Sequence, residues 1–125
     1  MNNTYPNIEK LKSKTTIDLL FSKGKSVSKF PLRLVYCPVE LPNGESLKMG
    51  VSVSKKYFKK AVDRNYFKRI LRESYRLNKQ ALLQNTNQKF AFMFFYQTKD
   101  RLTYQEINEK TKMLFEKFYQ VENNS

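Results

Sequence analysis

The sequence predicts one small α+β domain in which helices pack on a β-sheet. Three segments have apolar residues at helical spacing, and three have the patterns of extended strands. The helical segments are 14–22, 62–79 and 104–119, and the extended segments are 30–37, 47–54 and 89–96. The predicted element order is therefore α-β-β-(β)-α-β-α. The bracket marks a short additional strand that the 38–48 connection could contain.

Length and charge limit what the protein can be. Its 125 residues are enough for one domain with a single modest core. We expect this domain to span residues 1–125, with an ordered part at about 10–119 and flexible tails at 1–7 and 121–125. The net charge is +13, from 24 Lys and Arg against 11 Asp and Glu. This excess favours a polyanionic partner, nucleic acid first and an anionic membrane second.

The first half of the chain is predicted to form one helix and two strands. The helix ends at Gly24, and its apolar residues are Ile17, Leu20 and Phe21. In the strand at 30–37, apolar residues alternate and should face the core, namely Phe30, Leu32, Leu34 and Tyr36. We expect the strand at 47–54 to pair with it in antiparallel fashion, after a turn at 42–45.

The second half is predicted to contain a central strand and a capped helix. Residues 89–96 are almost all apolar, at even and odd positions alike, as in a strand covered on both faces. Thr103 and Glu106 have the spacing of a capping box, which begins a helix that runs to about Tyr119. The buried stripe of this helix should be Ile107, Thr111, Leu114, Phe115 and Phe118.

The segment at 62–79 is predicted to be an amphipathic helix with one basic face. A helical wheel gathers the following side chains in one arc of about 140°: Arg64, Asn65, Lys68, Arg69, Arg72, Arg76 and Lys79. The opposite side carries Val62, Tyr66, Phe67, Ile70, Leu71, Ser74 and Leu77. Such an array can neutralise successive phosphates, and it suits an RNA backbone better than base edges. The alternative is a solvated cationic face.

Two further features are consistent with a nucleic-acid partner. Lys55 and Lys56 follow the second strand, at a corner that can attract phosphate, although paired lysines are often only solvated. A shallow groove for unpaired bases could be formed by Ile17, Phe21, Arg33, Val35 and Cys37. The alternative is that Phe21 belongs to the core and Cys37 is a small buried filler.

The residue types exclude several kinds of enzyme. Histidine is absent and Cys37 is the single cysteine, which removes disulfides, Cys/His zinc sites and histidine-based catalysis. The acidic residues are scattered, without the clustered carboxylates that hold Mg²⁺ for phosphodiester cleavage. No apolar segment approaches a membrane span, and residues 1–20 do not have the pattern of a targeting signal. We therefore expect a cytoplasmic protein without catalytic or metal-binding residues of its own.

Two motifs resemble the signature of the bacterial ribonuclease P protein component. They are Val53-Ser54-Lys55-Lys56 and, within residues 61–76, Arg64-Asn65-Tyr66-Phe67-Lys68-Arg69-Ile70-Leu71-Arg72. The resemblance covers about residues 10–118. It implies the order α-β-β-β-α-β-α, a sheet of about four strands, and a left-handed βαβ crossover through the basic helix, against the usual right-handed rule.

The resemblance also implies a function. A member of this family is the accessory protein subunit of the ribonuclease P holoenzyme, and it binds the catalytic RNA and the single-stranded 5′ leader of precursor tRNA. The RNA then removes the leader in a Mg²⁺-dependent endonucleolytic reaction, with Mg²⁺ bound mainly by the RNA. We expect a protein that is monomeric apart from RNA and does not bind membranes.

Two sets of site residues follow from the resemblance. The catalytic-RNA set is Arg64, Asn65, Lys68, Arg69, Arg72 and Arg76. The leader set is Ile17, Phe21, Arg33, Val35, Lys55 and Lys56. Tyr66 stands where a second arginine is usual, and the wheel turns it away from the basic arc. Ile17 stands where an aromatic residue is common, which leaves Phe21 as the main aromatic candidate.

Two other functions fit parts of the pattern. A ribosomal or ribosome-assembly protein could share the basic charge and the small sheet, but it has no need of a leader groove. A stand-alone metal-dependent nuclease would need clustered acids, which the sequence does not offer.

Overall fold

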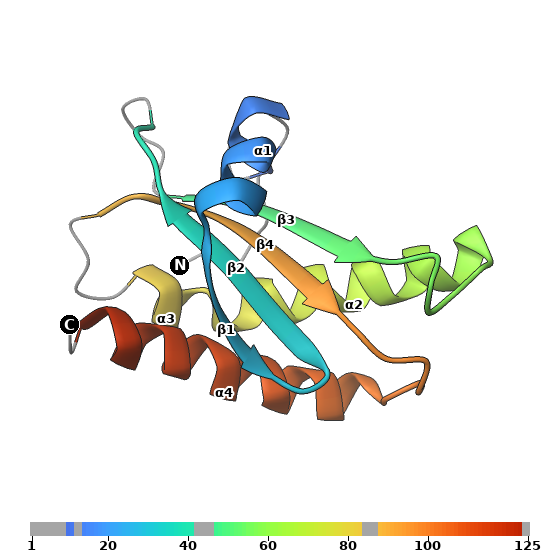
Figure 1. Cartoon of the computed structure of the whole chain (residues 1–125). Helices are drawn as coiled ribbons and strands as arrows, with labels where there is room; N and C mark the ends of the chain where they lie inside the picture. The colour runs from blue at the N-terminus through green and yellow to red at the C-terminus, as the bar shows by residue number, and fades with distance from the viewer. Residues whose placement is uncertain (1–9, 12–13, 42–46, 84–87, 124–125) are drawn as a thin grey trace.

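Helices cover both faces of a four-stranded sheet in the computed structural model (Figure 1). The structure describes residues 10–11, 14–41, 47–83 and 88–123. The elements are α1 (Lys14–Lys23), β1 (Lys25–Lys29), β2 (Leu32–Pro38), β3 (Leu47–Val53), α2 (Ala61–Asn78), α3 (Gln80–Leu83), β4 (Phe90–Tyr96) and α4 (Tyr104–Asn123). The predicted α+β fold and the order α-β-β-β-α-β-α are confirmed, with the short α3 as an addition after α2.

The strand order is β1-β2-β4-β3, with β4 in the interior of the sheet as predicted. β2 pairs with β1 and β4 in antiparallel fashion, whereas β3 pairs with β4 in parallel. Tyr96 at the end of β4 lies between Leu32 of β2 and Val53 of β3. The predicted antiparallel pair of the strands at 30–37 and 47–54 is therefore wrong, because the doubly covered β4 takes the place between them. The basic helix α2 connects the parallel strands β3 and β4.

The additional strand precedes β2 instead of following it. β1 is paired along its whole length, with residues 32–36 of β2, across a turn at Phe30 and Pro31 whose peptide bond is cis. Sequence patterns did not reveal β1 because Val27 is its single apolar residue, and the strand is held by backbone pairing with β2. Phe30 is 71% exposed in the turn, so its predicted place in the core is wrong. Residues 39–41 of the 38–48 connection form no strand, and 42–46 lie outside the described residues.

The sheet separates two hydrophobic clusters of unequal size. The larger cluster lies between the sheet and the pair α2 and α4, and it includes Leu32, Leu34 and Tyr36 as predicted. The smaller cluster lies under α1 and contains Leu20, Val35, Cys37, Ala91 and Met93. Burial raises the pKa of the Cys37 thiol, which agrees with its predicted role as a filler. β2 is thus covered on both faces for much of its length, because α1 packs on the face that was predicted to be more open.

Gly24 ends α1 as predicted, and the packing explains why a glycine is needed. Its backbone N–H donates to the Leu20 carbonyl oxygen at 2.9 Å. A Cβ atom at this position would lie 2.3 Å from that oxygen and 2.9 Å from Cγ1 of Val35. Any larger residue would push α1 away from β2.

α4 begins with the predicted capping box. The Thr103 N–H donates to Glu106 Oε1 at 2.9 Å, and the Glu106 N–H donates to Thr103 Oγ1 at 3.2 Å. Its buried residues are the five that were predicted. The predicted end at about Tyr119 is wrong, because the helix continues to Asn123, whereas residues 124–125 and 1–7 of the predicted tails lie outside the described residues. Near Asn123 the Tyr36 hydroxyl donates to Glu122 Oε2 at 2.8 Å, which fixes the last turn of α4 against β2.

Candidate nucleic-acid interface

The six residues of the predicted catalytic-RNA set all lie on α2, away from the side that packs in the core. The buried residues of this helix are Phe67, Ile70, Leu71, Ser74 and Tyr75. α2 packs against α4 as well as against the sheet, so its buried stripe is turned toward Tyr75, which the wheel did not predict. Val62, Tyr66 and Leu77 are consequently exposed, although the wheel places them on the side opposite the basic arc. Lys79, predicted in the basic arc, is buried at the carboxyl end of the helix.

Arg64 supports the entry to α2 from within the predicted set. Its guanidinium Nη1 donates to the carbonyl oxygens of Phe58 at 2.9 Å and of Lys59 at 2.8 Å. Both carbonyls belong to the segment between β3 and α2. This side chain therefore fixes the conformation of the chain that leads into the basic helix, in addition to carrying a charge.

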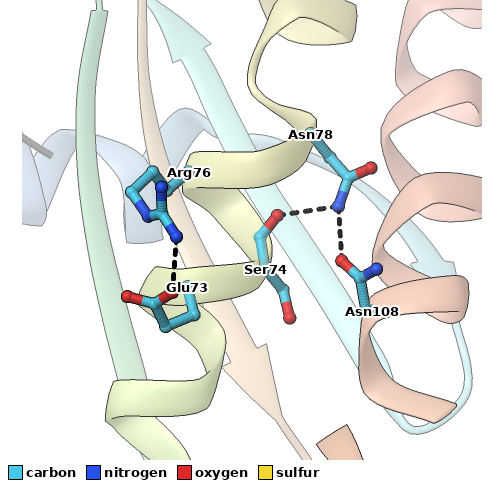
Figure 2. A network of polar contacts seen from close by, with 5 residues as sticks. All are labelled: Glu73, Ser74, Arg76, Asn78 and Asn108. Atoms are coloured by element: carbon cyan, nitrogen blue, oxygen red, sulfur yellow. Dashed lines mark hydrogen bonds and ion pairs between the residues drawn. The ribbon is translucent and has the colours of Figure 1, made fainter. Parts of the chain in front are cut away.

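The other end of the basic face is tied to its own acid and to α4 (Figure 2). Arg76 Nη2 lies 2.7 Å from Glu73 Oε2, and this ion pair raises the pKa of Arg76. On the other side of α2, Asn78 Nδ2 donates to the Ser74 carbonyl oxygen and to Asn108 Oδ1 of α4, each at 2.8 Å. Arg76 therefore carries a partly neutralised charge, while the Asn78 bridge sets the position of α2 against α4.

An arginine outside α2 extends the basic surface, and sequence reasoning missed it. Arg101 lies in the loop between β4 and α4, and its Nη1 is 3.2 Å from Oδ1 of Asp63. The two residues are 38 positions apart, so no local pattern could have paired them.

The predicted leader groove is partly filled by the packing of α1. Val35 is buried beneath this helix, so its predicted place on the groove surface is wrong. Arg33, two residues before Val35 on β2, remains exposed and lies opposite Phe95 of β4. Phe21 is 62% exposed and packs edge-on against Phe95, with ring centroids 6.2 Å apart. Phe21, Phe95 and Arg33 therefore form the open part of this face, and Phe95 is the residue that the sequence reading missed.

A cavity of about 600 Å³ lies beside α1 at the β3 edge of the sheet. It is lined by Ile17 of α1, Gly50 and Val51 of β3, Met93 of β4, Lys10, Leu11 and Arg72 of α2. Ile17 and Arg72 were predicted to belong to different RNA sites. The structure brings them to one cavity, because Arg72 lies where α2 passes the edge strand β3.

Lys55 and Lys56 lie in an exposed turn directly after β3. Ser54 organises this turn, because its Oγ accepts from the Lys56 N–H at 3.0 Å and its carbonyl oxygen accepts from Tyr57 N at 3.1 Å. Parallel pairing places the ends of β3 and β4 side by side, with Ser52 opposite Phe95. Lys55 and Lys56 therefore follow the end of β3, which lies beside Phe95 of β4.

The sequence as a whole matches known proteins. The family model for ribonuclease P matches residues 5–119. The ribonuclease P protein component of Porphyromonas gingivalis is 38% identical over 96 residues, which cover 75% of this chain and 70% of the relative. The chain belongs to the ribonuclease P protein family. Another family member, the ribonuclease P protein component of Chlorobaculum tepidum, is 37% identical over 83 residues, 64% of this chain and 54% of the relative.

Solved structures share the fold of this ribonuclease P family member. The RNase P protein of Staphylococcus aureus has a TM-score of 0.70 at 23% identity, over 88% of this chain and 94% of that protein. The RNase P protein of Thermotoga maritima has a TM-score of 0.68 at 25% identity, over 87% of this chain and 96% of that protein. The described residues contain neither a helix long and apolar enough to cross a membrane nor a group of three or more His, Cys, Asp or Glu side chains placed to hold a metal ion.

Proposed function

We propose that this protein is the subunit of a ribonuclease P holoenzyme that binds the catalytic RNA through α2 and the 5′ leader of precursor tRNA beside α1. The observation that carries the proposal is the basic face of α2, presented outward by a helix whose opposite side is anchored in the core. Membership of the ribonuclease P family makes the catalytic RNA the expected polyanion.

The basic face suits a folded RNA because its charges follow one helical ridge. Arg64, Lys68, Arg72 and Arg76 are spaced four residues apart, so they lie along one line on α2. Asn65 and Arg69 lie beside this line. Side chains in such a row can contact successive phosphates and release counterions, which gives affinity that falls steeply with salt.

The surface beside α1 suits a single strand. Phe21 and Phe95 offer ring surfaces for base stacking, and Arg33, Lys55 and Lys56 offer charge for the backbone. Ile17 adds an apolar wall to the neighbouring cavity. In this proposal the leader lies over the β2 and β4 strands and reaches the turn after β3.

The chemistry in this proposal belongs to the RNA. We assign Mg²⁺ mainly to the RNA, where it supports endonucleolytic removal of the leader, and we assign to the protein the binding and orientation of both RNAs. The protein would act in the cytoplasm as a monomer apart from RNA. Family membership and the net charge of +13 support this assignment.

The test is cleavage of precursor tRNA at low Mg²⁺ by the ribonuclease P RNA of the same genome, with and without the protein. We expect the protein to stimulate cleavage by the RNA and to cut nothing when it is alone. Absence of stimulation would contradict the proposal, and selective binding to ribosomal RNA would favour a ribosome-assembly role. Cleavage by the protein without RNA would instead indicate a nuclease.

A further inference from the structure

An exposed tyrosine lies at the edge of the basic face of α2. The Tyr66 side chain is 40% exposed. Its ring packs edge-on against Phe67, with centroids 5.0 Å apart and ring planes at 84°. Because Phe67 is fixed in the core, this contact orients the Tyr66 ring while part of its surface remains in solvent.

Two guanidinium groups flank this ring. The guanidinium carbon of Arg69, one turn further along α2, lies 5.6 Å from the Tyr66 centroid. That of Arg101, from the loop between β4 and α4, lies 6.0 Å away. Both distances are in the range of cation–π contacts, which extend to about 6 Å. Tyr66 therefore lies beside the basic surface, and the prediction that it is turned away from the basic arc is wrong.

The loop that carries Arg101 is fixed by a buried hydroxyl. The Tyr96 hydroxyl donates to the carbonyl oxygen of Asp100 and accepts from the N–H of Leu102 at 3.1 Å. These two bonds hold the chain on both sides of Arg101. The loop is thus anchored to the end of β4, inside the main core.

The Arg101 guanidinium is itself held in place. It pairs with Asp63 at 3.2 Å, and its carbon lies 5.3 Å from the Phe67 ring centroid and 5.8 Å from that of Phe58. A long side chain fixed in this way loses little further rotamer freedom when a ligand binds. Tyr66, Arg69 and Arg101 therefore form a surface that is already ordered without RNA.

We infer that Tyr66, Arg69 and Arg101 form a stacking site for an unpaired base of the catalytic RNA. This inference rests on the proposed function and deepens it, because it adds a base contact to the phosphate contacts of α2. A base that stacks on an aromatic ring gains affinity whatever its sequence, and an arginine plane can stack on a base or pair with its phosphate. The site is separate from the leader groove, since α1 and α2 pack on opposite faces of the sheet.

The test compares Tyr66→Leu and Tyr66→Phe in binding to the ribonuclease P RNA of the same genome at several KCl concentrations. We expect Tyr66→Leu to weaken binding roughly five- to a hundred-fold, the range for loss of one stacked base. The salt dependence of the affinity should not change, because a neutral ring does not contribute to the release of counterions when the RNA binds. Tyr66→Phe should bind within about two-fold of wild type, because it keeps the ring.

Tyr119→Leu is the matched control. Tyr119 is a partly exposed tyrosine near the carboxyl end of α4, outside both proposed RNA surfaces, and this variant should bind like wild type. The inference is overturned if Tyr66→Leu binds like wild type, or if the Leu and Phe variants are weakened equally. If Tyr66→Leu unfolds, ultraviolet crosslinking of the wild-type complex decides: an adduct on Tyr66 supports stacking, and its absence overturns it. Failure of the proposed function looks different, because the wild-type protein itself would then not prefer this RNA to an unrelated structured RNA.

Discussion

At the scale of single residues, the basic side chains of α2 divide by what else they do. Arg64 Nη1 donates hydrogen bonds to two carbonyl oxygens of the segment before the helix, and Arg76 forms an ion pair with Glu73. Lys68 lies on the same ridge, on the side of α2 away from the core. The charge of these residues therefore does not by itself predict how much each contributes to RNA binding, because some of them also stabilise the fold.

Arg64→Ala and Lys68→Ala should separate these roles. Each variant should weaken RNA binding and lower the salt dependence by about one released ion, as expected for one phosphate contact. Arg64→Ala should in addition lower the Tm, because two carbonyl oxygens lose their donor, whereas Lys68→Ala should change stability by less than about 0.5 kcal/mol. Salt titrations of RNA affinity and thermal unfolding measure the two effects. Equal loss of Tm in both variants would contradict the structural role of Arg64.

At the scale of elements, α4 shows how a local sequence motif and a distant contact define one helix. Its start is set by the reciprocal bonds of Thr103 and Glu106, which the sequence predicts. Its last described turn is held by Glu122, which accepts from the Tyr36 hydroxyl of β2. The last turn, from residue 120 to Asn123, is mostly polar, so local patterns end the helix too early.

The capping box makes part of the stability dependent on pH. The N–H and the side chain of Thr103 hold the pKa of Glu106 below its ordinary value of 4.5. A lowered folded-state pKa means that the contribution of Glu106 is complete above the pKa of the unfolded state and is lost as the pH falls through the folded-state value. We expect Glu106→Ala to lower the Tm at pH 7, and this difference from wild type should shrink as the pH falls through the lowered pKa of Glu106 toward pH 3.

Glu116→Ala is the control for this pH dependence. Glu116 is an exposed glutamate in the middle of the same helix, and its removal should change the Tm little at either pH. Thermal unfolding by circular dichroism from pH 3 to pH 7 provides the comparison. A Glu106→Ala difference that stayed constant over this range would show that the ionised carboxylate is not what caps α4.

At the scale of the whole molecule, the sheet separates the two proposed RNA surfaces, which meet at one edge. α1 with Phe21 covers one face, and α2 packs on the other (Figure 1). At the β3 edge, Ile17 and Arg72 line the same cavity. The two surfaces should therefore act independently at most positions and together at this edge.

Double-mutant cycles on the reconstituted holoenzyme test this arrangement. Phe21→Ala should reduce the preference for precursor over mature tRNA by about 1–3 kcal/mol, the range for one stacked base. Phe21→Ala and Arg69→Ala should add within about 0.5 kcal/mol, as for distant sites, whereas Ile17→Ala and Arg72→Ala should depart from additivity by more. Binding of precursor and mature tRNA gives the energies. Additive behaviour of Ile17 and Arg72 would show that the cavity does not join the two surfaces.

The sequence by itself determined the helices and strands whose apolar residues repeat regularly. Local periodicity predicts the buried stripe of α4, the doubly covered β4 and the basic face of α2. In each of these elements the positions of the apolar residues along the sequence indicate which side chains are buried. The motif around Arg64 and Lys68 also carries the resemblance to the ribonuclease P protein family. These features depend on residues a few positions apart.

Only the tertiary structure decided what depends on distant pairing. β4 separates β2 from β3, and β1 forms on β2 although Val27 is its single apolar residue. Burial of Val35 under α1 depends on the same kind of long-range packing. So does the joining of Arg101 to Asp63, and local periodicity carries no information on contacts between residues far apart in the chain.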